Sequence, residues 1–230
     1  MGHTPTVGWW LGRAAWILAR GGVIAHATEG VFGLACDARN DAAVERVLAI
    51  KRRDARKGLL LIAHDFATIR DWLRAPADEF AQLLSVDGPT TTWVVPAAAQ
   101  VSSRITGGRD TLGVRITRHP QAAALCRRIG APLISTSANL SGQAPALTAV
   151  QARLRLGRRV DWVVPGRILH GAGPSIIRDA RSGVVLRGAG GDTPRQPVGA
   201  ASPPCPVDPR SSPGQLQGNP LNPSIMDSRA

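Results

Sequence analysis

Short strand-like and helix-like segments alternate along residues 23–188, and this alternation most limits the folds open to the chain. Apolar runs rich in Val, Ile and Leu indicate strands, whereas apolar residues at helical spacing indicate amphipathic helices. An Arg181-Ser182-Gly183 turn joins two short apolar segments and predicts a hairpin with strands at 175–177 and 184–186. The other segments predict strands at 23–26, 59–63, 91–95, 112–116 and 132–134, and helices at 41–50, 67–73, 78–84, 120–129 and 148–156. Because the order lacks the strict strand–helix–strand repeat of a Rossmann sheet, we expect a mixed α/β domain.

Capping residues mark the ends of two of these helices. Asn40 or Asp41 can cap the helix predicted at 41–50, because a short polar side chain satisfies the first backbone N–H groups. Pro120 suits the first turn of its helix and Gly130 its end, so the boundaries of that helix are predicted from both sides.

The two termini differ in character from the segments between them. The apolar run Trp9–Leu18 predicts an amphipathic helix ending near Gly21-Gly22, because Arg13 interrupts it and no cleavage site follows. The sequence has no apolar run of transmembrane length, so we expect no membrane partner. Nine of the 18 prolines lie between Pro194 and Pro223, and apolar periodicity stops near Gly190. We therefore predict a folded domain at 1–190 and a disordered Pro-rich tail at 191–230.

The net charge of +12 and a pI near 11.5 favour a polyanionic partner, either a nucleotide, a nucleic acid or both. An Arg-biased genome of high GC content explains the same charge without a partner. Cys36, Cys126 and Cys205 are too few and too scattered for a disulfide framework or a zinc site. We expect the first two to be buried thiols in a reducing cytoplasm, and no structural metal.

Only two of the 28 cationic side chains are lysines, Lys51 and Lys57, and both follow the helix predicted at 41–50. Lysine is a compact point charge, whereas arginine is a planar fork, so this placement points to a site that needs an ammonium group. Compensation of the helix dipole is the alternative, although any cation would serve there.

The hydroxyl-rich segment Ser135-Thr136-Ser137-Ala138-Asn139-Leu140-Ser141-Gly142 follows an apolar strand. Small polar residues let a phosphate or ribose approach the backbone closely, and period two places Ser135 and Ser137 on one side. An ordinary Ser/Thr/Asn loop remains the alternative.

Two further segments carry possible function. The glycines of Thr28–Leu34 suggest a tight turn, but a plain loop is the favoured interpretation of that segment alone. On the strand near 112–116, Thr111, Gly113 and Arg115 share a face, and an arginine in so apolar a strand needs an anion from the protein or a ligand.

Motifs for a Ser nucleophile elbow, a paired-His zinc site or a Walker A loop are missing from the sequence. Positioning and charge neutralisation are therefore favoured over covalent catalysis.

Taken in order over about residues 10–188, these segments resemble the YrdC/Sua5 family in its short bacterial form. Ala27 to Leu34 resembles the family's Pro-Thr-Glu-Thr-x-Tyr/Phe-Gly-Leu, and Lys51-Arg52-Arg53 resembles its Lys-x-Arg. Further similarities lie in Lys57-Gly58-Leu59, Gly88-Pro89-Thr90-Thr91, Val114-Arg115, Ser135–Asn139 and Pro174-Ser175-Ile176-Ile177. Each motif is loose alone, but the ordered set is specific.

The resemblance implies a twisted mixed or mostly parallel sheet with flanking helices and a deep basic concavity. It implies an enzyme, a nucleotidyltransferase that forms threonylcarbamoyl-adenylate and pyrophosphate from L-threonine, bicarbonate and ATP, with Mg²⁺ on the phosphates. A downstream transferase complex would then modify adenosine 37 of tRNAs that read ANN codons.

The resemblance also assigns roles to individual residues of this sequence. Lys51 and Arg53 are expected to be catalytic. Threonine binding is assigned to Thr28, Gly30, Arg115 and Ser135, and ATP binding to Arg53, Lys57, Thr111, Ser137, Asn139, Pro145, Ser175 and Arg187.

The sequence departs from the family pattern at Ala27, Gly30, Asp54 and Ile176, and we expect these changes to tune the amino-acid pocket. Two other functions are weighed against the synthase. One is a non-catalytic RNA-binding domain, which the pI favours but the lack of an exposed-aromatic RNA motif disfavours. The other is a carbamoyl-adenylate enzyme like the related domain of hydrogenase maturation proteins, whose usual zinc-finger motifs are missing from this sequence.

Overall fold

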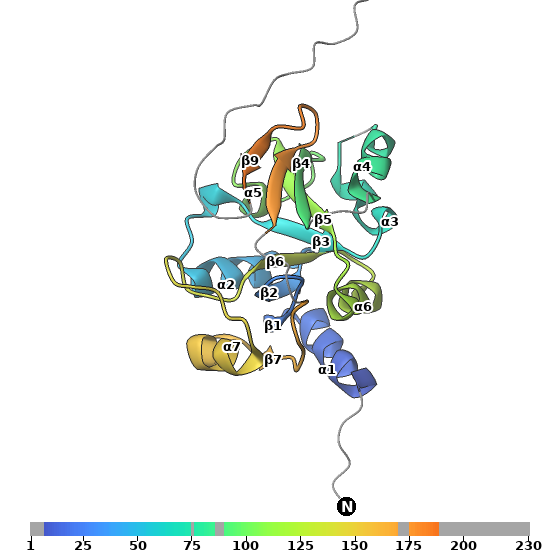
Figure 1. Ribbon diagram of the computed structural model, residues 1–230. Coiled ribbons are helices and arrows are strands. Elements are labelled where there is room, and N and C mark those ends of the chain that lie inside the picture. The colour runs from blue at the N-terminus through green and yellow to red at the C-terminus, as the bar shows by residue number, and fades with distance from the viewer. Residues whose placement is uncertain (1–6, 75, 86–89, 170–174, 189–230) are drawn as a thin grey trace, which may run out of the picture. The chain divides into compact units, whose positions relative to one another are not determined.

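The alternating segments form a single mixed sheet in the computed structural model, which describes residues 7–74, 76–85, 90–169 and 175–188 (Figure 1). Nine strands are found among these residues, in the spatial order β7-β1-β2-β6-β3-β5-β4-β8-β9. Their bounds are β1 Ile24–Ala27, β2 Phe32–Asp37, β3 Leu60–Ala63, β4 Thr91–Pro96, β5 Thr111–Ile116, β6 Leu133–Ser137, β7 Trp162–Val163, β8 Ile176–Asp179 and β9 Val185–Arg187.

Parallel and antiparallel pairs both occur in this sheet. The pairs β1–β7, β3–β5 and β4–β8 are parallel, whereas β1–β2, β2–β6, β3–β6, β4–β5 and β8–β9 are antiparallel. The expected α/β class with a twisted mixed sheet and flanking helices is thus confirmed.

The helices include the four longest predicted segments and several short ones. Their bounds are α1 Val7–Ala19, α2 Asp41–Lys51, α3 Phe66–Ile69, α4 Ala81–Ser85, α5 Ser103–Thr106, α6 Pro120–Ile129 and α7 Ala149–Leu156. Short 3₁₀ turns lie at η1 Ala55–Lys57, η2 Arg70–Trp72, η3 Ala77–Phe80 and η4 Gly157–Arg159. The Asn40 side chain accepts a hydrogen bond from the N–H of Ala43, so it is the predicted cap of α2.

Helices cover the two faces of the sheet unequally. One face packs against residues of α2, α3, α4, α5 and α7, such as Val47, Ile69 and Ile105. The other face packs against α1 and α6 in a separate core, which joins Leu18 and Leu125 to alternate residues of the strands. Figure 1 shows α1 and α6 together on one side of β1 and β2.

The second face is covered only over part of its width, and the strand register shows where it is open. Ile62 and Leu133 are paired neighbours in the core under α1 and α6. Two residues further along, Leu60 pairs with Ser135 and with Gly113, and Val94 pairs with Gly113. Since side chains two apart share a face, these residues lie on the same face beyond the helices. The open part of that face is where a ligand cavity can form.

Several sequence predictions need correction. Residues 28–34, expected as a plain loop, run into β2, which is buried along its whole length and therefore lacks the alternation of a half-buried strand. Ser135, Thr136 and Ser137 belong to β6 rather than to a loop. The helix expected at 67–73 is a short α-helix followed by a 3₁₀ turn, and the one expected at 78–84 is a 3₁₀ turn that continues into α4.

All described residues belong to one compact unit that spans Met1–Pro197. The predicted tail at 191–230, Cys205, and the motif residues Gly88, Pro89 and Pro174 lie outside the described residues. Cys36 and Cys126 are buried free thiols, as predicted. In the part of the chain that is described, none of the helices has both the length and the apolarity needed to cross a bilayer.

Candidate active site

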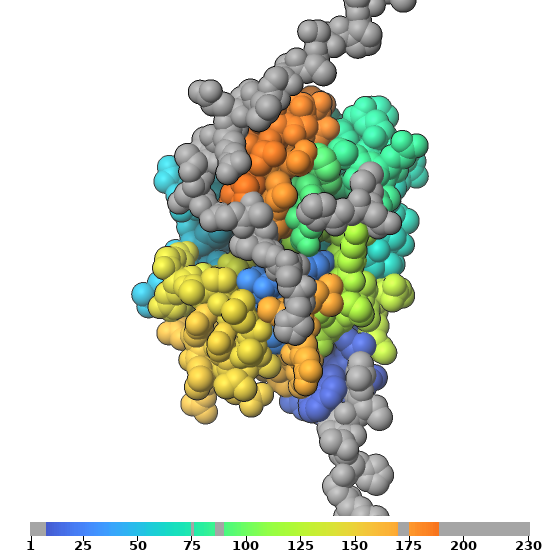
Figure 2. Space-filling model, in the orientation of Figure 1, coloured from blue at the N-terminus to red at the C-terminus, as the bar shows by residue number. Residues whose placement is uncertain are grey.

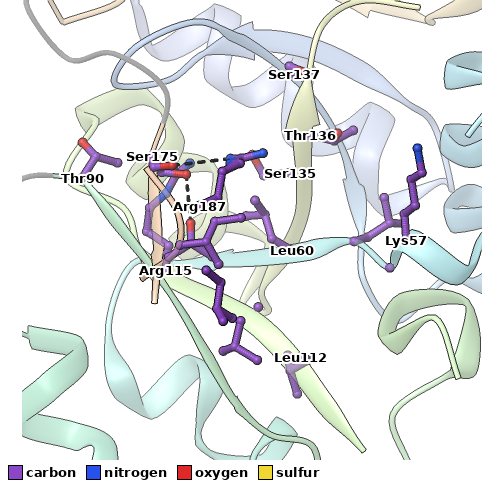
Figure 3. Close-up of a pocket in the computed structure, with 18 of the residues that line it drawn as sticks. Lys57, Leu60, Thr90, Leu112, Arg115, Ser135, Thr136, Ser137, Ser175 and Arg187 are labelled. Carbon is purple, nitrogen blue, oxygen red and sulfur yellow. Dashed lines mark hydrogen bonds between the residues drawn. The ribbon is translucent and has the colours of Figure 1, made fainter. Parts of the chain in front are cut away.

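A cavity of about 720 Å³ lies on the open face of the sheet (Figure 3). This volume falls in the range of pockets that hold a nucleotide-sized ligand. Residues of six strands form its floor, because the same pleat turns them toward it: Gly33, Leu60, Thr92, Val94, Thr111, Gly113, Arg115, Ser135, Ser137, Ile177 and Asp179. The predicted shared face of Thr111, Gly113 and Arg115 is confirmed by this lining.

Five cationic residues line the cavity; besides Arg115 they are Arg53, Lys57, Arg109 and Arg187, and we call these four the cation group. Arg53 donates to the carbonyl of Gly58 (3.2 Å), and Arg109 donates to the carbonyls of the η1 turn. Arg187 donates to the carbonyl of Ser175 (3.4 Å). Partial burial, and the nearby charges of Arg187 and Arg109, lower the pKa of Arg53. Three arginines held by neutral carbonyls, together with the exposed Lys57, leave a positive potential in the cavity.

The end of α2 separates the side chains of Lys51 and Arg53, one of which is buried while the other lines the cavity. Arg52 ends the helix in the left-handed conformation (φ 49°), and its N–H bonds to the carbonyls of Ala49 and Leu48. This is a role that glycine usually fills. The abrupt turn leaves Lys51 buried in the last helical turn, while Arg53 reaches the cavity.

The η1 turn is held in place by a close approach of two loops. Gly58 has φ +64°, and a Cβ there would lie 2.5 Å from the Arg109 guanidinium and 3.1 Å from the carbonyl of Ile105. Only glycine fits this position. The close approach that it allows lets Arg109 reach the η1 turn, and the turn carries Lys57 at the cavity.

The Lys51 ammonium is enclosed by oxygen atoms of Ser137, at the end of β6, and of Asn139, just after it. Its Nζ donates to the carbonyls of Ser137 (2.6 Å) and Asn139 (3.0 Å), and to the Asn139 Oδ1 (2.8 Å). The Ser137 Oγ lies at 3.3 Å, and the Ser141 hydroxyl donates back to the Lys51 carbonyl. Lys51 is 2% exposed, and burial, together with the charge of Arg53, lowers its pKa to about 8.

These contacts hold the Lys51 ammonium next to the cavity rather than in its lining. It does not belong to the cavity lining, and neither does Asn139, which receives its hydrogen bond. The Ser137 hydroxyl also donates to Asn139 Oδ1 (2.6 Å), and the Asn139 amide donates to the Gln143 carbonyl. Lys51 therefore stabilises the cavity lining indirectly, through its hydrogen bonds to Ser137. Its catalytic role stays a prediction.

A buried ion pair lies at another part of the cavity. Arg115 is 8% exposed, and its Nη2 lies 3.4 Å from the Oε2 of Glu29, which is 4% exposed. Burial lowers the pKa of Arg115 and Glu29 raises it, with burial the larger effect. The anion that an arginine in this strand requires is thus supplied in part by the protein.

The cavity brings together most residues to which the sequence assigned a role. These are Thr28, Gly30, Arg53, Lys57, Thr111, Arg115, Ser135, Ser137, Pro145, Ser175 and Arg187. Their individual roles stay predictions. Sequence reasoning missed Arg109, Thr92 and Asp179; of these, only Arg109 has a local signal, since it follows the pair Gly107-Gly108. Figure 3 shows Lys57 on one side of the view, Arg115 and Ser175 on the other, and Ser135 between them.

The fold and the cavity define a mixed α/β domain whose open sheet face forms a cationic small-molecule pocket. The Sua5/YciO/YrdC family model, described as "Telomere recombination", matches residues 16–189. The chain belongs to this family.

Three relatives show how far the similarity reaches. Threonylcarbamoyl-AMP synthase of Nitrosococcus oceani is 46% identical over 180 residues, which cover 78% of this chain and 97% of the relative. The crystal structure of P. abyssi Sua5 complexed with L-threonine has a TM-score of 0.72 and 27% identity, and the match covers 80% of this chain and 55% of the longer one. E. coli YciO has a TM-score of 0.67 and 25% identity, over 82% of this chain and 93% of that one.

Proposed function

We propose that this protein is a threonylcarbamoyl-AMP synthase, a nucleotidyltransferase that makes threonylcarbamoyl-adenylate and pyrophosphate from L-threonine, bicarbonate and ATP. One observation carries the proposal: a single cavity holds a cation group suited to a triphosphate and a buried arginine suited to a carboxylate. The identity of 46% with a synthase of nearly the same domain length supports it.

In this proposal, the triphosphate occupies the part of the cavity near the cation group. Arginine forks and the Lys57 ammonium offset its charge, and small hydroxyls donate to the remaining oxygens. The residues proposed to hold ATP are Arg53, Lys57, Thr111, Ser137, Pro145, Ser175 and Arg187, to which the cavity adds Arg109. Lys51 and Asn139 act on this site by fixing the backbone of Ser137.

Mg²⁺ would enter with ATP and be held mainly by the phosphates, as is usual for this ion. Asp179 is the one carboxylate among the described lining residues, and its Oδ1 already accepts the N–H groups of Arg181 and Ser182. This donor set fits an ion that arrives with its substrate. When bound, the ion would supply further neutralisation of the phosphate charge.

The proposed threonine site lies at Arg115, Ser135 and the turn from Thr28 to Gly30. The Thr28 hydroxyl donates to the Val31 carbonyl (2.6 Å), which closes the turn. Gly30, where relatives are expected to have threonine, adds no side chain to this pocket. The Arg115 fork can bind the substrate carboxylate through two parallel hydrogen bonds.

The chemistry requires positioning rather than a protein nucleophile. The threonine amine attacks the bicarbonate carbon with loss of water, and an oxygen of the resulting carbamate attacks the α-phosphorus of ATP. The bond to pyrophosphate then breaks, and that anion leaves. Since two anions must meet, the protein contributes by holding both and offsetting their repulsion.

The product would pass to a threonylcarbamoyl transferase complex that acts on tRNA. We place the reaction in the cytoplasm, where ATP and tRNA substrates occur.

The test is release of pyrophosphate from ATP by the purified full-length chain, with each substrate omitted in turn. We expect release that depends on both L-threonine and bicarbonate, and a product that carries a threonylcarbamoyl group on AMP by mass spectrometry. Release without threonine dependence, or no release, would refute the synthase.

RNA binding is kept as a second candidate because the structure exposes aromatic residues that the sequence did not predict as exposed. Trp16 is 60% exposed with the Arg20 guanidinium over its ring at 4.8 Å, and Trp9 is 48% exposed beside Arg13. Aromatic rings next to cations can stack nucleic-acid bases. Salt-dependent binding of tRNA by a protein that releases no pyrophosphate would favour this candidate over the synthase.

A further inference from the structure

Glu29 lies in the turn that borders the proposed amino-acid site, but its buried carboxylate is not among the groups assigned to that site above. It lies in the turn between β1 and β2 and is 4% exposed. A carboxylate so far from solvent is costly unless the surrounding structure compensates for it. Its position next to Arg115 suggests what it contributes.

The protein fixes Glu29 independently of Arg115. Its Oε1 accepts hydrogen bonds from the Thr117 hydroxyl (2.6 Å) and from the N–H of Arg118 (3.0 Å). Both donors lie just after β5, in the segment that leads to α6. Burial alone would raise the pKa of Glu29, but Arg115 and these two donors together lower it, so the group is a carboxylate.

The other carboxylate oxygen of Glu29 faces Arg115 but makes no hydrogen bond with its guanidinium. Glu29 Oε2 lies 3.4 Å from Arg115 Nη2, too loose for a well-formed charge-assisted hydrogen bond. Arg115 Nε and Glu29 Oε2 are both buried without a hydrogen-bond partner. The pair therefore orients the guanidinium by its charge, while donors of the fork remain available to a ligand in the cavity.

The neighbouring histidines do not take over this role. Burial and the nearby His119 lower the pKa of His26 to about 4, so His26 is neutral near pH 7. The Nε2 of His119 donates a hydrogen bond to the carbonyl of Arg167 (2.9 Å). The charge that offsets the burial of Arg115 comes from Glu29.

We infer that Glu29 is a positioning residue that aims the Arg115 fork at the carboxylate of the amino-acid substrate. The inference rests on the proposed function, because it takes L-threonine as the ligand of Arg115. Glu29 acts through Arg115 and does not touch the substrate itself.

The test is the E29Q variant of the full-length protein, measured by calorimetric binding of L-threonine and by steady-state kinetics. The glutamine keeps the size of the side chain and can still accept from Thr117, but its amide then faces the Arg115 donors. We expect threonine affinity to fall about tenfold, while the KM for ATP changes less than about twofold. The matched control is E45Q, which removes an exposed carboxylate paired with Arg104 and should bind threonine as the wild type does.

Two further variants separate positioning from a general structural role. T117V removes the hydroxyl that holds Glu29 and should weaken threonine binding in the same direction, by about threefold. In an R115K background, E29Q should add less than about a twofold loss, because a positioning residue has nothing left to position.

Each outcome decides a different statement. If the wild type binds no threonine, the proposed function fails and the inference fails with it. If the wild type binds threonine and E29Q binds it equally well, only the inference fails. An equal loss of threonine and ATP affinity in E29Q, or a full additional loss in the R115K background, would show a structural role instead.

Discussion

The cation group and the Glu29–Arg115 pair line or adjoin one cavity, yet they manage positive charge in opposite ways. Arg53, Arg109 and Arg187 donate to backbone carbonyls, and no carboxylate pairs with the cation group among the residues that the structure describes. Arg115 instead faces a carboxylate in a region nearly closed to solvent. Carbonyls orient a cation without cancelling its charge, whereas a carboxylate cancels most of it.

This difference suits the two proposed ligands. A triphosphate carries several charges on flexible oxygens and is attracted by net positive potential. An amino-acid carboxylate carries one charge in a fixed plane, so a correctly aimed fork selects it by geometry. Figure 2 shows the orange β8–β9 hairpin, which carries Arg187, on the face that also displays parts of the yellow segment 140–160.

The largest effect is expected from R115K, which keeps the charge of the buried pair but removes its fork. Lysine can still face Glu29, so the fold should be retained, but it offers the carboxylate a single donor direction. We expect the KM for threonine to rise about 100-fold, equivalent to about 2.7 kcal/mol, with the KM for ATP nearly unchanged. Steady-state kinetics with each substrate varied separately makes this measurement. Equal loss for both substrates would mean that the two regions do not act separately.

Lys51 shows a third arrangement, in which neutral oxygens surround a buried cation. Here we expect a pH-dependent fall in kcat that is smaller than the effect of R115K and larger than that of K57A. Because the pKa of Lys51 is lowered to about 8, its ammonium group loses a proton as the pH rises through this value. The neutral amine then has one N–H donor fewer for the surrounding oxygens. At pH 9 about a tenth remains charged, so kcat should fall about tenfold between pH 7 and pH 9 at saturating substrates. The pKa of Cys126 is raised by burial to about 12, so that thiol does not titrate in this window.

The matched variant for this prediction is K51R, which stays charged throughout the range. It should be less active at pH 7, because a planar fork does not match oxygen atoms arranged around an ammonium. Its residual activity should show no fall near pH 8. An identical alkaline fall in wild type and K51R would assign the titration to another group.

The elements with local signals could be predicted from the sequence. The helix at 120–129 has the observed bounds of α6, because proline and glycine define its two ends. Most strands were predicted within one or two residues, since short apolar runs mark them. The β2 strand was missed because Gly33, Ala35 and Cys36 are small and all its residues are buried, which removes both composition and alternation as signals.

The site could be predicted as a set of residues but not as an arrangement. Lys51 contacts Ser137 and Asn139, which lie 86 and 88 positions away, and no local pattern indicates that its ammonium turns inward. For the same reason, the sequence identified the need of Arg115 for an anion without indicating Glu29, 86 residues earlier in the chain. Such pairings depend on strand order, which the sequence alone did not determine.

The smallest effect is expected at the cation group, where neighbouring residues allow a direct comparison. Lys57 lines the cavity, whereas the adjacent Arg56 in η1 is paired with Asp54 (2.8 Å). K57A should raise the KM for ATP about threefold to fivefold at low salt, and R56A should leave it unchanged. Because Lys57 is exposed, the effect should shrink as ionic strength rises, while the effect of R115K on threonine should persist. A K57A effect independent of salt would mean that Lys57 is shielded like Arg115, and the contrast between the two regions would then be wrong.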